Sequence, residues 1–69
     1  MKNKPYRTTQ DIANDYAGHI CTINGEPGKV TGRLNRFATV GSFCGTYQAE
    51  FAWSTVERIM RDGYGEFEV

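Results

Sequence analysis

The sequence predicts a mainly β, α+β fold, in which five short antiparallel strands form a small, strongly bent barrel with two short helices. Apolar and polar residues alternate in several short runs, which is the period of half-buried strands. Eight glycines separate these runs at turns. Helical spacing of apolar residues occurs near the N-terminus and again just before the last run, so the two helices are expected there.

One domain is expected from the length. A chain of 69 residues buries only about 60% of its unfolded surface on folding, which leaves little room for a second core. Residues 1–7 are polar and include a proline, so they are expected to form a flexible N-terminal arm. Residues 8–69 are then expected to form the single small barrel domain.

The first helix is expected to begin after Thr8. A threonine side chain can cap free backbone amides, and Asp11 in the first turn interacts favourably with the helix dipole. Ile12 and Tyr16 lie one turn apart and would dock the helix on the barrel, and Gly18 would end it.

Strands are expected at residues 19–23, 29–34, 37–40, 47–53 and 65–69. Asn24 and Gly25 are a strong tight-turn pair, and residues 26–28 would extend that break. Gly32 falls at an inward position of the second strand, where a glycine lets the strand bend sharply. The alternation in the fourth strand divides its residues between two faces. One face carries Gln48, Glu50 and Ala52, and the other carries Tyr47, Ala49, Phe51 and Trp53.

The second helix is expected just before the last strand. Ser54 and Glu57 have the spacing of a capping box, which predicts the helix start. Gly63 would end the helix in a left-handed conformation. The apolar stripe facing the barrel consists of Val56, Ile59 and Met60.

This order of elements resembles the SH3-like barrel, in which a short helical turn separates the last two strands. The resemblance covers residues 19–69 and implies a closed antiparallel barrel. An open antiparallel sheet with two helices on one face is the alternative.

The charged residues balance to a net charge of zero, which argues against a generic polyanion binder and against an acidic mimic of DNA. Six basic and three acidic residues lie in residues 1–36, against two basic and five acidic in residues 37–69. No apolar run is long enough for a membrane span, and no apolar segment follows the basic start as it would in a signal peptide. A bacterial cytoplasm is the expected location, where Cys21 and Cys44 would be free thiols.

No catalytic, metal or cofactor motif is found. His19, Cys21 and Cys44 lack the paired spacing of a zinc site. Cys44 lies in a glycine-flanked loop, but a nucleophilic cysteine needs a neighbouring base, and His19 is the only histidine. The glycines do not have phosphate-loop spacing either. The chain is therefore expected to be non-enzymatic and to bind no cofactor or metal.

Two further sequence patterns resemble those of other classes of protein. Residues 8–13 and 54–60 look like the helices of a helix-turn-helix, but that motif joins them by three or four residues, and about forty lie between them here. The stretch at 55–60 also loosely resembles the end of the plasmid-borne trimethoprim-resistant dihydrofolate reductase, a tetrameric SH3-like barrel. That family's V-Q-I-Y stretch is missing, since the nearest match is Ala49 to Ala52.

The candidate binding residues form two sets. Lys29 and Arg33 are four apart on a predicted strand, so they would share an outward face, with Arg36 in the next turn. Such a basic face either binds nucleic acid or is simply solvated. The second set combines tyrosines suited to an interface with polar strand residues: Tyr47, Gln48, Glu50 and Tyr64. Trp53 directly precedes the helix and is expected to be structural.

The function expected from these observations is that of a protein-binding module. A small, neutral barrel without a catalytic site is similar in size and character to the anti-CRISPR and related anti-defence proteins that phages and mobile elements encode. That similarity implies an inhibitor that blocks a host protein or ribonucleoprotein complex by occlusion, with no membrane partner, and it is compatible with a homodimer. The alternative is a nucleic-acid-binding barrel that uses Lys29, Arg33 and Arg36.

Overall fold

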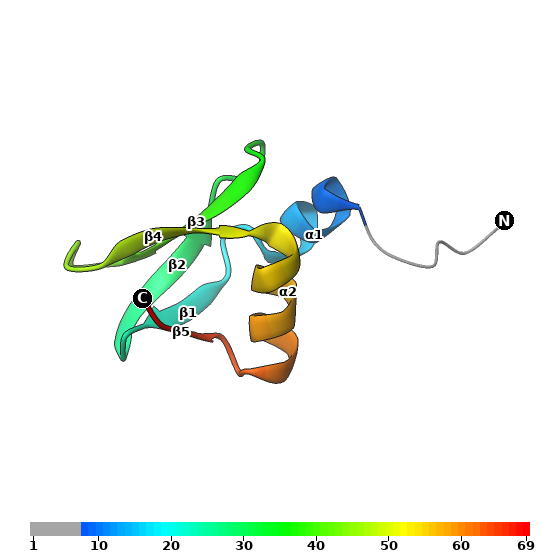
Figure 1. Ribbon diagram of the computed structural model, residues 1–69. Helices are drawn as coiled ribbons and strands as arrows, with labels where there is room; N and C mark the ends of the chain where they lie inside the picture. The colour runs from blue at the N-terminus through cyan, green and yellow to red at the C-terminus, as the bar shows by residue number, and fades with distance from the viewer. Residues whose placement is uncertain (1–7) are drawn as a thin grey trace, which may run out of the picture.

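The computed structural model describes residues 8–69, so the arm predicted at residues 1–7 lies outside the described residues. A curled sheet forms a half-barrel, and one helix packs on its concave side (Figure 1). The elements in chain order are α1 Thr9–Tyr16, β1 Ile20–Ile23, β2 Glu26–Thr31, β3 Phe37–Ser42, β4 Gln48–Ala52, α2 Trp53–Asp62 and β5 Glu66–Phe67.

The strand order across the sheet is β4-β3-β2-β1-β5. The first four strands pair antiparallel with their sequence neighbours, as expected. The last strand differs, because β5 pairs parallel with β1, with Thr22 opposite Glu66 and Ile23 opposite Phe67. The prediction that all five strands are antiparallel was therefore wrong at β5. Since α2 returns the chain across the concave side before β5 begins, β5 can enter beside β1 in the same direction.

The core lies between the concave side of the sheet and the two helices. Alternation along the strands turns Ile23, Val30 and Val40 inward, and each is fully buried. Trp53 and Val56 of α2 close this core from the other side, while Ile59 and Met60 pack against it half-buried. The predicted inward stripe of α2 is thus confirmed.

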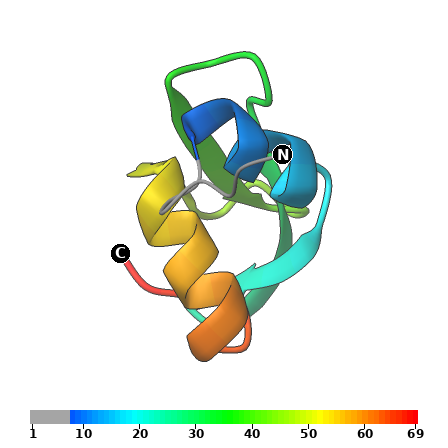
Figure 2. The same ribbon diagram turned by 90° about the vertical axis from the view of Figure 1, so that its right-hand side faces the viewer.

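The start of α1 also follows its prediction. Thr8 is the N-cap, its hydroxyl accepts a hydrogen bond from the Asp11 amide at 3.1 Å, and the Asp11 carboxylate accepts one from the Thr8 amide at 3.3 Å. Ile12 is buried and Tyr16 packs at the core edge. The chain leaves the helix through Gly18 with φ of +89°. The helix lies beside the first turns of α2 (Figure 2).

The predicted capping box of α2 was wrong, whereas Gly63 ends the helix as predicted but in another conformation. The helix begins at Trp53, and its N-cap is Ala52, with no side-chain cap, so Ser54 does not form a capping box with Glu57. The Trp53 ring is buried, and its Nε1 donates to the Asn35 carbonyl at 3.0 Å. These two contacts fix the position of Trp53 and with it the start of the helix. At the other end Gly63 has φ of −109° and is not left-handed.

The second strand begins and ends earlier than predicted. Residues 26–28, expected to extend the turn, belong to β2, where Gly28 lies so close to β3 that a Cβ on it would collide with the Gly41 carbonyl. The strand ends at Thr31, and Gly32 follows with φ of +92°. Gly32 therefore marks a bend, as predicted, but the bend takes Arg33 out of the sheet.

Candidate functional site

The convex side of the sheet carries the largest group of the predicted binding residues. Lys29 of β2 and Gln48 of β4 both lie opposite Gly41 of β3, one on each side of it. Glu50 of β4 lies opposite Thr39, which in turn lies opposite Thr31. We call this surface the outer face; its exposed or half-exposed members are Lys29, Thr31, Phe37, Thr39, Gly41, Phe43, Gln48 and Glu50.

A groove runs across the outer face at Gly41. Since Gly41 has no side chain, the space between Lys29 and Gln48 stays open, and a cavity of about 370 Å³ remains there. Phe43 lies at one end of it, and threonine hydroxyls from β2 and β3 line the rest. The Thr31 hydroxyl donates to the Thr39 carbonyl at 3.1 Å, which holds this wall in place. The Gly41 groove is shallow and combines a cation, amide and hydroxyl groups with one aromatic ring.

Two exposed phenylalanines on the outer face are not among the candidate binding residues predicted from the sequence. Phe37 is 48% exposed and Phe43 is 60% exposed, and they stand at opposite ends of β3. The alternation of the strand contains the signal: Ala38 and Val40 point inward, so odd-numbered neighbours must point outward. Exposed aromatic side chains beside polar groups are typical of protein interfaces.

The predicted basic set does not form one cluster. Lys29 lies on the outer face, but Arg33 and Arg36 lie in the loop between β2 and β3. Arg33 extends toward α1, where its Nη1 donates to the Asn14 side chain at 3.4 Å. The positive φ of Gly32 redirects the chain and separates the two cations that strand spacing would have placed on one face.

The two tyrosines of the candidate set also lie elsewhere. Tyr47 points to the concave side, where it packs half-buried against the core, and its amide donates to the Ser42 hydroxyl at 3.1 Å. Tyr64 is 89% exposed, but it lies in the connection between α2 and β5 and has a positive φ of 59°. Of the seven candidate residues, the structure brings three together on the outer face: Lys29, Gln48 and Glu50.

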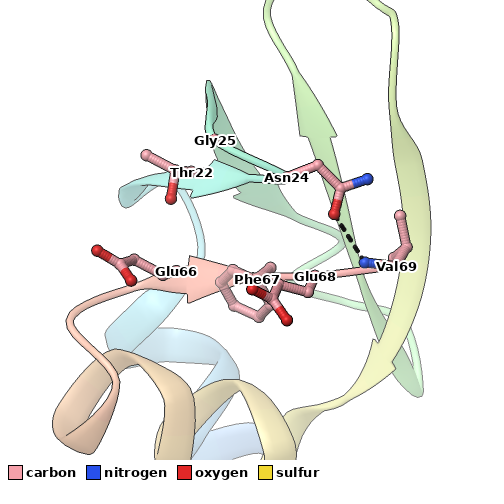
Figure 3. A pocket seen from close by; sticks show the side chains of 7 residues that line it. All are labelled: Thr22, Asn24, Gly25, Glu66, Phe67, Glu68 and Val69. Carbon is pink, nitrogen blue, oxygen red and sulfur yellow. Dashed lines mark hydrogen bonds between the residues drawn. The ribbon is translucent and has the colours of Figure 1, made fainter.

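A second groove, of about 610 Å³, lies beside β5 at the C-terminal end of the described chain (Figure 3). Its floor is formed by the pairing of β1 and β5, and the Val69 amide donates to the Asn24 side chain at 2.9 Å. The carboxylates of Glu66 and Glu68 border it (Figure 3). Sequence reasoning did not anticipate this groove, because it depends on the parallel pairing of β5.

Cys44 is an exposed thiol with two hydroxyl groups close to it. Its Sγ lies 3.0 Å from the Thr46 hydroxyl and 3.6 Å from the Ser42 hydroxyl. Hydrogen bonds from Thr46 first, and then from Ser42, lower the pKa of the Cys44 thiol, because they stabilise the thiolate. Cys21 is buried, and burial raises its pKa. Both thiols are free, as the sequence predicted.

The histidine considered as a base for Cys44 contacts α1. The single histidine, His19, packs its ring edge-on against Tyr16 with the ring centres 5.5 Å apart. Within residues 8–69, no three His, Cys, Asp or Glu side chains gather closely enough to hold a metal ion. Neither of the two helices in this part of the chain is long and apolar enough to cross a membrane.

Comparison with known proteins adds no relative. No protein-family model, no curated protein and no solved structure matches this chain.

Proposed function

We propose that this chain is a non-enzymatic protein-binding module that blocks a host protein complex by occlusion, in the manner of the phage-encoded anti-CRISPR and anti-defence proteins. The contact surface in this proposal is the outer face. The observation that carries it is the placement of exposed Phe37 and Phe43 beside Lys29, Gln48 and Glu50 on one continuous sheet surface. Aromatic side chains with a surrounding polar ring are the arrangement that gives protein interfaces most of their binding energy.

The charge distribution favours a protein partner over nucleic acid. The chain contains eight acidic and eight basic side chains, a net charge of zero. Non-specific nucleic-acid binding depends on phosphate contacts by clustered cations, and a net charge of zero provides no general attraction to phosphate backbones. The separation of Lys29 from Arg33 removes the basic face on which the nucleic-acid alternative depended.

The fold is a small α+β half-barrel with mostly strand structure, and the finer SH3-like assignment belongs to the proposal. The strand meander and the position of α2 before the last strand support it. The parallel pairing of β5 and the ten-residue length of α2 are departures from the short helical turn of that architecture.

An affinity pull-down from bacterial lysate tests the proposal, with nuclease added to half of each sample. The tagged wild-type chain should retain a stoichiometric protein in both halves. Two outer-face variants, Phe43→Ser and Gly41→Val, should lose it, because the first removes the exposed ring and the second fills the groove without changing charge. Tyr64→Ser is the matched control, since it removes a more exposed aromatic ring from another part of the molecule.

The outcomes separate the alternatives. Loss of every partner on nuclease treatment would support the nucleic-acid alternative, whose binding should also weaken steeply with salt. Equal retention by the outer-face variants and the Tyr64→Ser control would place the contact surface elsewhere and reject the outer face.

A further inference from the structure

The strand β4 forms one edge of the sheet; it contains no proline, lysine or bulge, and its one charged side chain is Glu50. Edge strands in soluble proteins are usually shielded by a proline, a lysine, a bulge or a covering segment, because their free amides and carbonyls can pair with another strand. The residues of β4 are Gln48, Ala49, Glu50, Phe51 and Ala52, and their pairing with β3 is regular throughout.

Hydrogen bonds alternate along the β3–β4 ladder, and this alternation identifies which backbone groups of β4 are free. The Ser42 amide donates to the Tyr47 carbonyl at 2.9 Å, so Ser42 and Tyr47 are a hydrogen-bonded pair. Antiparallel ladders alternate, and Ala49 is therefore bonded to β3, whereas the amides and carbonyls of Gln48 and Glu50 point away from it. Within residues 8–69, no other segment donates to or accepts from these four backbone groups.

We infer that β4 pairs antiparallel with β4 of a second copy, with Gln48 opposite Glu50 of that copy. This register uses all four free backbone groups on each chain in four hydrogen bonds around a two-fold axis. The axis passes between the two Ala49 residues, a pair without hydrogen bonds where the backbones approach most closely and small side chains fit best.

Charge selects this register over its neighbours. If the second copy's β4 moved to the next possible register in one direction, the two Glu50 carboxylates would lie directly opposite each other. Like charges in that position are destabilising. The opposite shift would bring Gln48 opposite itself and leave Glu50 facing Thr46, outside the strand. In the inferred register, each Gln48 side-chain amide can donate to the Glu50 carboxylate of the other copy.

The β4 side chains on the concave side of the sheet also match those of the second copy in this register. Tyr47 falls opposite Phe51 of the second copy, and both side chains are only half-buried in one copy. Pairing would cover part of the remaining exposed area of each ring. Because the two-fold axis is perpendicular to the sheet, both outer faces end up on the same side of the assembly. The inferred dimer shares Gln48 and Glu50 with the outer face and makes no use of Lys29, Phe37 or Phe43.

Sedimentation velocity over a wide concentration series tests the inference with the full chain. A two-strand contact is smaller than a standard interface, so the expected behaviour is a weak monomer–dimer equilibrium that shifts toward dimer at high concentration. Circular dichroism of each variant verifies that it is folded. A chain that stays monomeric across the series would overturn the inference.

Charge changes at Gln48 test the register. Gln48→Lys places a cation opposite Glu50 at two positions related by the two-fold axis, so it should tighten the dimer about fivefold. Gln48→Glu should weaken the dimer by a similar factor. Glu50→Gln should leave it close to wild type. Gln10→Lys and Gln10→Glu are matched controls, because Gln10 is an exposed glutamine on α1, away from β4 (Figure 1).

The variant results have defined consequences. If the Gln10 variants change the equilibrium as much as the Gln48 variants, net charge rather than β4 pairing controls association, and the inference fails. If Glu50→Gln tightens the dimer and the Gln48 substitutions do not change its affinity, the two Glu50 residues lie opposite each other. That result would overturn the stated register.

Discussion

The rings of Phe51 in β4 and Phe67 in β5 lie with their centres 5.0 Å apart and their planes tilted by 57°. These two strands are the opposite edges of the sheet and share no strand pairing. The curl of the sheet therefore brings its edges together through side chains, and the half-barrel is closed by an aromatic contact where a complete barrel would have a hydrogen-bonded ladder.

The energetic coupling of this ring pair can be measured with leucine substitutions. Phe51→Leu and Phe67→Leu should each lower the free energy of unfolding by about 1 kcal/mol, since leucine keeps most of the apolar volume. The double variant should cost less than the sum by about 0.5–1 kcal/mol, because the ring–ring contact is lost only once. Urea denaturation of the four proteins gives the cycle, and strictly additive losses would show that the rings do not interact.

The two helix starts should respond differently to alanine. Thr8→Ala removes the hydroxyl that caps α1 and should lower the free energy of unfolding by about 1 kcal/mol. Ser54→Ala should change it by less than about 0.5 kcal/mol, because the Ser54 side chain caps nothing. Thermal unfolding measures both, and a larger loss at Ser54 would restore the capping box that the sequence suggested.

Two glycines on paired strands should differ in their tolerance of a methyl group. Gly28→Ala drives a Cβ into the Gly41 carbonyl and should destabilise the fold by about 1–3 kcal/mol. Gly41→Ala meets the Gln48 side chain and the Tyr47 carbonyl, each at 3.7 Å; these are ordinary contacts, so it should be neutral or slightly stabilising. Denaturation midpoints compare them directly, and equal losses at both positions would contradict the close approach at Gly28.

The two thiols should differ in the pH dependence of their alkylation. With Cys21→Ala as background, Cys44 should react with iodoacetamide at a pH below that of an ordinary thiol, because hydrogen bonds lower its pKa. Thr46→Val removes the main donor, so the midpoint of the rate profile should move to higher pH. In the wild type, buried Cys21 should react only after unfolding. A Thr46→Val profile identical to that of its parent would exclude this cause.

Much of the candidate site could be read from local periodicity. Alternation along residues 47–53 places Gln48 and Glu50 on one face, opposite Tyr47 and Phe51, and the structure confirms this separation. Arg33 shows the limit of the same reasoning. Strand spacing predicts that it shares a face with Lys29, but the positive φ of Gly32 ends the alternation, and the side chain reaches α1 instead.

The sequence by itself determined the features that depend on neighbouring residues: the Thr8 cap of α1, the inward stripe of α2 and the alternating faces of β4. Only the tertiary structure decided the parallel entry of β5, the start of α2 at Trp53 and the strand conformation at Gly28. Each of these depends on a partner distant in sequence: β1, the Asn35 carbonyl and Gly41. Local propensities differ by less free energy than such contacts contribute, so the distant partner decides the outcome.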